Sequence, residues 1–259
     1  MEPEKSFYRR YESLILGGGS VAIAIGIWQA MWSAGKISPL FMSGPSAIAA
    51  RFWEDLTQGS LGADMAYSGK NFVLGFLGAV VAGVVLGVLV GWYRRLAMIL
   101  EPFLNALYAT PRVAMVPLII IWFGIGMWSK VFIVFISAFF PILVNTIGGI
   151  KATDHDLLRA ARAYCASDWQ IFTTLAVPGA VPFILTGVRQ GVALGLIGVV
   201  VGEMFGGSEG IGFRVAYGGQ TFATDTLFVG VIIIATAGIV LTWFAERLEK
   251  RFSRWRPER

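Results

Sequence analysis

The chain has 259 residues, of which 56% are hydrophobic and only 14% are charged, with a net charge of +5. So much apolar surface cannot be hidden in one water-soluble core, so the composition excludes a soluble globular protein. It indicates an integral membrane protein with several spans.

Six apolar runs are long enough to cross a bilayer, which takes roughly 20 residues. They cover residues 14–34, 72–92, 104–125, 131–150, 183–206 and 227–245. Because lipid offers no water to the backbone, each span should be a helix. The third run is the least regular, since Pro111, Arg112 and Pro117 fall inside it. We expect an all-α protein with six transmembrane helices in one domain, residues 14–245.

The first run could instead be a signal peptide, because basic residues precede it and Ser33, Ala34 and Gly35 end it. Its apolar length of about 20 residues exceeds the usual signal-peptide core of about 7 to 15. We therefore expect a retained first span.

Lys and Arg are distributed unevenly among the loops. An N-tail (1–13), the second and fourth loops and a basic C-tail (246–259) hold 14 of the 21, while the alternate loops hold 5. Since cytoplasmic loops carry the excess, both termini are predicted to be cytoplasmic. This bias explains the net charge without a nucleic-acid partner.

Glycine and alanine recur at every fourth position in two of the runs. The stripe in the second run is Gly75, Ala79, Gly83, Gly87 and Gly91. The fifth run has two stripes, Gly187, Gly191 and Gly195, and then Gly198, Gly202 and Gly206. Small residues let membrane helices approach closely. The stripes could serve packing within the chain, or they could face a second copy.

Few polar residues lie inside the runs, and these are the candidates for a translocation path. They are Arg112, Asn145, Arg189, Gln190 and Glu203, and apolar Met115, three residues after Arg112, is added as a candidate. The two arginines either reach the headgroups or a neighbouring helix, or they provide a positive field for anions. For Glu203 we favour a structural partner in the bundle.

Other classes of protein fit the sequence less well. A self-contained secondary carrier or channel is the alternative, but a carrier should show acidic or histidine relays near the midplane. A membrane enzyme would need clustered catalytic groups, whereas His155 is the only histidine. The single cysteine and histidine also predict no metal site.

The cytoplasmic segment 151–182 is predicted to form two short helices, 154–164 and 168–176. Thr153 to Asp156 resembles a capping box, and Ser167 to Gln170 is a better one. Cys165 and Ala166 occupy the turn, where a left-handed residue would favour glycine. Pro178 and Pro182 should end the second helix.

One face of this segment is apolar: Leu158, Ala161, Cys165, Trp169 and Phe172 follow spacings of three and four residues. Acidic residues balance the basic ones on its polar side. A helix that lies on headgroups should be rich in Lys and Arg, so we expect a protein partner.

The same residues resemble a known family. Ala160, Ala161, Cys165, Leu175 and Pro178 are spaced like the EAA loop of ABC importer permeases, Glu-Ala-Ala, three residues, Gly, nine residues, Ile-x-Leu-Pro. Arg159, Cys165 and Val177 depart from that pattern, replacing Glu, Gly and Leu. Segments 122–130 and 202–212 resemble the nitrate, sulfonate and taurine branch of these permeases.

The resemblance implies a type I importer with the MetI-like fold, in the inner (cytoplasmic) membrane of a bacterium. Two permease copies, expected to form a homodimer within membrane lipid, would bind two cytoplasmic ATPase subunits and an extracytoplasmic substrate-binding protein. ATP and Mg²⁺ would be used by the ATPase, and this chain should bind no cofactor, since it has no Gly-x-x-x-x-Gly-Lys-Ser/Thr loop.

The resemblance also implies that segment 151–182 is the coupling loop. Its candidate contact residues are Asp156, Arg159, Ala160, Ala161, Cys165, Ala166, Ser167, Asp168 and Pro178. The implied substrate is a small anion or zwitterion, such as nitrate, a sulfonate, taurine, bicarbonate or a carboxylate, although heterocycle importers share this branch.

Overall fold

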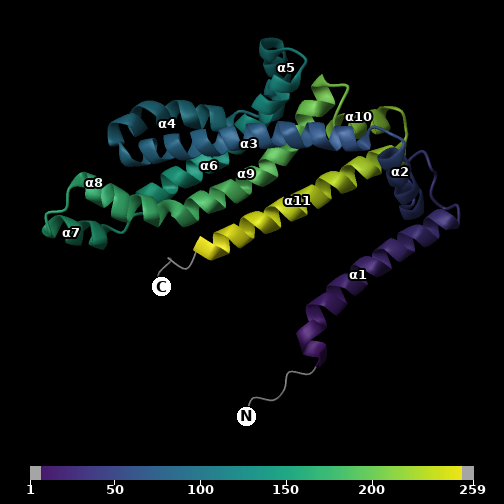
Figure 1. Cartoon of the computed structure of the whole chain (residues 1–259), viewed down its shortest axis with the longest axis horizontal. Coiled ribbons are helices and arrows are strands. Elements are labelled where there is room, and N and C mark those ends of the chain that lie inside the picture. The colour runs from purple at the N-terminus through teal and green to yellow at the C-terminus, as the bar shows by residue number, and fades with distance from the viewer. Residues whose placement is uncertain (1–6, 253–259) are drawn as a thin grey trace. The chain divides into compact units, whose positions relative to one another are not determined.

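The computed structural model describes residues 7–252, and all regular structure within that range is helical (Figure 1). Residues 1–6 and 253–259, which belong to the predicted N-tail and C-tail, lie outside the described part. The helices are α1 (Phe7–Ser33), α2 (Pro45–Thr57), α3 (Leu61–Trp92), α4 (Arg94–Ala109), α5 (Arg112–Phe123), α6 (Met127–Lys151), α7 (His155–Ala163), α8 (Asp168–Ile171), the π-helical η1 (Phe172–Ala176), α9 (Val177–Gly206), α10 (Ile211–Gln220) and α11 (Thr224–Phe252).

Four of the described helical stretches are long and apolar enough to cross a membrane: α3, α6, Asp168–Gly206 and α11. They coincide with the second, fourth, fifth and sixth predicted runs. The bent pair α4 and α5 would make a fifth span, and the 27-residue α1 occupies the first predicted run. The predicted number of six spans is therefore approximate, whereas the all-α fold is confirmed.

The third predicted span is not one straight helix. α4 ends at Ala109, α5 begins at Arg112, and the two axes differ by 101°. Thr110 adopts an extended conformation with ψ 128°, as expected for a residue that precedes a proline. Pro111 thus breaks the helix at a position that the sequence had marked only as irregular.

The predicted end of the second loop helix at Pro178 and Pro182 is wrong. α8, η1 and α9 form one continuous helix of 39 residues from Asp168 to Gly206. The π turn changes the hydrogen-bond spacing just before Pro178, and Thr173 Oγ1 donates to the carbonyl of Trp169 over 2.9 Å. The π turn therefore accommodates Pro178, which has no backbone N–H to donate to the preceding turn of the helix.

The chain divides into two compact units, and the larger comprises residues 62–213 and 232–259. Its core is built around α6, with α3 and α9 packed against it (Figure 1). A Cβ atom at Gly75 would lie 2.5 Å from the carbonyl oxygen of Val131, and one at Gly187 would lie 2.9 Å from Cβ of Asn145. Both glycine stripes thus pack onto α6, which confirms packing within the chain at these positions.

The smaller unit comprises residues 1–61 and 214–231. The Gln29 side chain of α1 accepts from the Ser46 N–H at the start of α2 over 3.0 Å. Thr224, the first residue of α11, bonds to the connection between α1 and α2. Its hydroxyl lies 2.9 Å from the Ser43 hydroxyl and donates to the Pro39 carbonyl over 2.8 Å. These contacts fix α2 within its unit.

Candidate translocation path and coupling hairpin

A cavity of about 330 Å³ lies in the larger unit where α5 begins. Its walls come from the α4–α5 bend, α6 and α9. The lining residues are Tyr108, Ala109, Thr110, Pro111, Arg112, Val113, Val116, Ile133, Ser137, Leu194, Ile197, Gly198 and Val201. The wall is mostly apolar, with three hydroxyl groups and a single charged side chain.

That charged side chain is Arg112, in the first turn of α5. Its guanidinium carbon lies 5.6 Å from the ring centre of Tyr108 and 5.7 Å from that of Phe140. One terminal nitrogen donates to the Ser137 carbonyl over 3.5 Å, and the buried Nε has no hydrogen-bond partner. Among the described side chains, no carboxylate forms an ion pair with Arg112. A positive charge held by aromatic faces in an apolar wall is suited to an anion.

Arg189, the other predicted arginine, is neutralised inside the chain. Its guanidinium nitrogens lie 3.6 Å from Glu246 and 3.4 Å from Glu249 on α11, and Thr186 donates to Glu249 over 3.0 Å. This geometry supports pairing with a neighbouring helix rather than a positive field along a path.

The predicted polar pair Asn145 and Gln190 is brought together by α6 and α9. The Asn145 amide donates to Gln190 Oε1 over 3.1 Å and to the Pro141 carbonyl over 2.7 Å. Met115 packs beside a buried apolar cluster on α5 and α6. None of these three side chains lines the cavity that Arg112 borders.

Glu203 is completely buried near the end of α9. Its carboxylate accepts from Ser68 Oγ over 2.8 Å, from Asn71 Nδ2 over 3.1 Å and from the Gly212 N–H over 3.0 Å. These bonds tie α3, α9 and the start of α10 together. The side chain is therefore a partner within the bundle, and it does not border the cavity.

The sequence analysis missed Lys130, which is only 2% exposed at the start of α6. Its ammonium group donates to the carbonyls of Gly206 over 2.5 Å and of Gly126 over 3.1 Å. The cation caps the C-terminal end of α9, where free carbonyls and the helix dipole favour positive charge. Lys130 stands just before an apolar run, so the sequence placed it in a loop. Its partner Gly206 lies 76 residues away, so no local pattern indicated the contact.

The hairpin formed by α7 and α8 has the predicted second cap. Ser167 Oγ accepts from the Gln170 N–H over 3.3 Å, and the Gln170 side chain accepts from the Ser167 N–H over 2.8 Å. The predicted first cap is displaced by one residue, because Asp154 caps α7 while Thr153 donates to the Ile150 carbonyl at the end of α6. Thr153 is thus used to close the preceding helix.

Cys165 occupies the turn of this hairpin with φ 60°. The predicted left-handed conformation is confirmed at the position where the permease pattern has glycine. A non-glycine residue there carries strain of about 1 kcal/mol or more. The thiol is exposed.

The hairpin exposes large side chains instead of covering them. Tyr164 is 89% exposed and Trp169 is 71% exposed, and among residues 7–252 Arg159 forms an ion pair only with Asp156 on its own helix. On the other side, Phe172 lies 5.1 Å from the ring of Trp92 at the end of α3. Within the described chain the hairpin is therefore supported from one side only.

The predicted contact residues share this exposed segment. Asp156, Arg159 and Ala160 are exposed on α7, Ala161 and Ala166 are half-buried, and Cys165, Ser167 and Asp168 are exposed at the turn. Pro178 lies further away, half-buried in the first turn of α9.

Residues 79–254 match the protein family "Binding-protein-dependent transport system inner membrane component". The chain belongs to this family. It is therefore an inner-membrane permease subunit of an ABC importer, a class in which a separate subunit hydrolyses ATP and a binding protein delivers the substrate. The putative aliphatic sulfonates transport permease protein SsuC of Bacillus subtilis is 33% identical over 91% of this chain and 85% of its own length.

Further relatives bear different names. The taurine transport system permease protein TauC of Escherichia coli is 29% identical over 93% of this chain and 89% of its own length. The riboflavin transport system permease protein RibX of Chloroflexus aurantiacus is 32% identical over 98% of this chain and 96% of its own length. The inward-facing MetNI methionine ABC transporter has a similar structure, with a TM-score of 0.65 at 16% identity over 76% of this chain and 98% of that chain. This likeness confirms the MetI-like fold.

Proposed function

We propose that this permease imports small organic anions of the alkylsulfonate type. The observation that carries the proposal is the Arg112 guanidinium without a carboxylate partner in an otherwise apolar wall. An alkylsulfonate has an anionic head for that group and a short apolar tail for Val116, Ile133 and Ile197. A neutral heterocycle would leave the guanidinium uncompensated, so the geometry favours the chemistry named for the sulfonate relatives over that named for the riboflavin relative.

Uptake by the reconstituted importer, containing the permease, its ATPase and its cognate binding protein, tests the path. Arg112→Gln is expected to reduce ATP-driven uptake of radiolabelled ethanesulfonate by about tenfold, the loss of one charge-assisted contact in a dry site. Arg189→Gln is the matched control, because that arginine is already paired with Glu246 and Glu249. Equal uptake by the Arg112→Gln variant and the wild type would contradict the proposal. The roles of Met115, Asn145, Arg189, Gln190 and Glu203 in a path stay predictions.

We infer further that the α7–α8 hairpin contacts the ATPase through Arg159 and Asp168, with Cys165 at the bend. The exposure of the hairpin's charged and aromatic side chains supports this assignment. Reversing both charges, Arg159→Glu with Asp168→Lys, is expected to lower ATPase co-purification and stimulated hydrolysis by about tenfold or more. Lys36→Glu, in a predicted extracytoplasmic loop, is the control. If both readouts stayed at the wild-type level, the assignment would be wrong.

We propose in addition that two copies of this chain form the membrane part of the importer. The membership in a family of importer permeases supports this arrangement, and Ile121, 77% exposed at the end of α5, and Ile125, 80% exposed just after it, are available for contact with the second copy. Native mass spectrometry of the detergent-purified complex is expected to show two permease and two ATPase chains. A complex with one permease copy would contradict the homodimer.

A further inference from the structure

The 13-residue α2 places its charges and its apolar residues on unexpected sides. In a helix of a soluble protein the charged face points to water and the apolar face is buried. Here Asp55 is only 6% exposed, whereas Trp53 is 66% exposed and Leu56 is 42% exposed. Although Ile48 is buried and Glu54 is exposed, α2 turns its largest apolar side chains outward and one carboxylate inward, unlike a helix that faces water.

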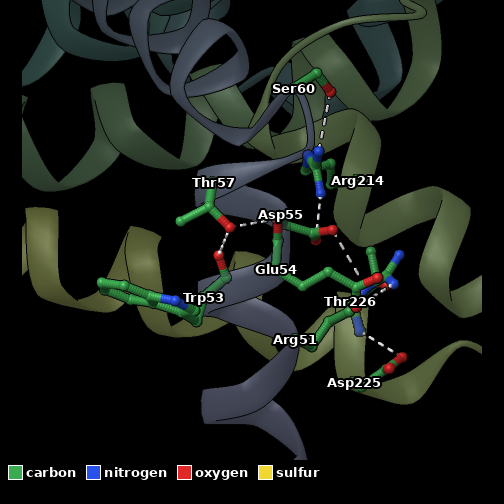
Figure 2. A network of polar contacts seen from close by, with 9 residues as sticks. All are labelled: Arg51, Trp53, Glu54, Asp55, Thr57, Ser60, Arg214, Asp225 and Thr226. Carbon is green, nitrogen blue, oxygen red and sulfur yellow. Dashed lines mark hydrogen bonds and ion pairs between the residues drawn. The ribbon is translucent and has the colours of Figure 1, made fainter.

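The charged side of α2 is occupied by contacts within its own unit. Asp55 lies between two arginines, with Arg214 on α10 at 2.7 Å and Arg51 on α2 at 3.3 Å, and Arg214 also donates to Ser60 over 2.9 Å. Figure 2 shows Trp53 pointing away from the side on which Asp55 and Arg214 meet. The polar network therefore sets which face of α2 remains uncovered.

The uncovered face carries no charged side chain. Ala49, Phe52, Trp53 and Leu56 follow each other at helical spacing and are all exposed. Glu54 lies on the flank, about 100° around the axis from Trp53. The connection before α2 adds Leu40, 59% exposed, and Phe41, 79% exposed.

Neighbouring contacts hold this apolar surface in place. Gly44, the N-cap of α2, lies so close to α1 that a Cβ there would be 2.2 Å from the Trp32 ring. The Pro39 carbonyl and the Ser43 hydroxyl bond to Thr224. The exposed aromatic and aliphatic groups are thus presented by a fixed backbone.

We propose that α2 is an interfacial helix that lies flat in the extracytoplasmic headgroup region, with Trp53, Leu56 and Phe41 turned into the lipid. At 13 residues it is about 20 Å long, too short to cross a hydrocarbon layer of about 30 Å. It follows α1, the helix of the first predicted span, whose Ile23 and Ile27 are likewise exposed in the same unit, so we expect lipid to lie beside this unit. Tryptophan is the residue that best suits the boundary between headgroups and hydrocarbon.

Lipid fits this face better than a docking protein does. A binding protein that leaves during each transport cycle would uncover four neighbouring apolar side chains to water, and a docking site would carry charges for steering. The face of α2 has none. Lipid covers such a surface permanently and requires no charge pairing.

Depth-dependent quenching in vesicles tests the inference. An environment-sensitive nitrobenzoxadiazole probe is attached to Trp53→Cys or Leu56→Cys in a Cys165→Ala background, with the permease–ATPase complex reconstituted in phosphatidylcholine. Glu54→Cys is the matched control on the same helix, and Phe41→Cys gives a second site should α2 variants fail to fold. We expect phosphatidylcholine spin-labelled at acyl carbon 5 to quench the probe at 53, 56 and 41 about threefold more than at 54. A water-soluble nickel chelate should show the opposite order.

Three results would overturn the inference. Strong quenching by nickel at 53 and 56 would place the face in water. Quenching by neither reagent would mean that protein covers it. Nickel quenching that disappears when the binding protein is added would identify a docking surface instead of a lipid contact.

Discussion

The bundle of α3, α6 and α9 and the hairpin of α7 and α8 are built in opposite ways. In the bundle, glycines remove side chains so that backbones touch, and buried groups such as Glu203 have their bonds within the chain. In the hairpin, Tyr164 and Trp169 project outward and Cys165 holds a strained backbone. The difference separates residues that stabilise this chain from exposed residues that we propose contact the ATPase subunit. Four substitutions test it, ordered by their expected effect on stability.

Glu203→Ala is expected to have the largest effect. It removes the acceptor for Ser68, Asn71 and the Gly212 N–H in a fully buried site. We expect the free energy of unfolding to fall by roughly 3–5 kcal/mol. The thermal midpoint of the detergent-purified protein measures it. Glu203→Gln is the control, because its amide oxygen can still accept, and Asn71 Oδ1, buried without a partner, can rotate to accept from the new amide. Equal midpoints for Glu203→Ala and the wild type would show that the cluster does not stabilise the bundle.

Gly75→Ala should cost about 2 kcal/mol, because the new Cβ would lie 2.5 Å from a backbone oxygen of α6 that cannot move aside. Gly69→Ala on the same helix is the matched control. Nothing lies within 4 Å of a Cβ at that position, so it should be neutral or stabilise the helix by up to about 1 kcal/mol. The thermal midpoints of the two variants are compared. Equal midpoints would contradict the inference that Gly75 is required for close packing of α3 on α6.

Cys165→Gly is expected to stabilise the hairpin by about 1 kcal/mol, since glycine adopts φ 60° without a clash. The measurement is amide hydrogen exchange of residues 160–168, which should slow about fivefold if that stability is local. Cys165→Ser, which keeps the Cβ, should leave exchange unchanged. Faster exchange in Cys165→Gly would mean that the thiol contributes a contact of its own.

Tyr164→Ala should change stability least, by less than about 0.5 kcal/mol, because the side chain is 89% exposed. Its effect should appear instead in the affinity for the ATPase, which we expect to fall about tenfold or more, as for an aromatic anchor in an interface. Surface plasmon resonance with the isolated ATPase measures the affinity. Tyr217→Ala, in the smaller unit, serves as the control. A loss of ATPase affinity of similar size in both variants would contradict a specific contact between the hairpin and the ATPase.

The sequence alone predicted much of the fold because the information for it is local. Apolar runs located α3, α6, α9 and α11, and the cap at Ser167 defined the start of α8. The helices α2 and α10 were not predicted, because 13 and 10 residues are too short for a search based on span length. The continuity of the helix through Pro178 depends on a π turn, which no residue pattern indicated.

The site was predicted less completely, because its contacts join residues that lie far apart in the sequence. Arg112 stood out as a charge inside an apolar run, and the structure places it in a cavity wall. Ser68, a partner of Glu203, lies 135 residues away from it in the sequence. Glu246 and Glu249, the partners of Arg189, lie 57 and 60 residues after it. Such contacts depend on how helices pack, so their absence from sequence reasoning is expected.

The uninterrupted helix from Asp168 to Gly206 has a mechanical consequence. Its 39 residues make a rod about 58 Å long, with the hairpin turn at one end and the Glu203 cluster near the other. Because the helix is continuous, a displacement at Ser167 would be carried along it toward the Glu203 cluster, which bonds to the start of α10. The π turn at Phe172–Ala176 and Pro182 interrupt the regular hydrogen bonding of this helix, so their stiffness would set how much of that displacement arrives.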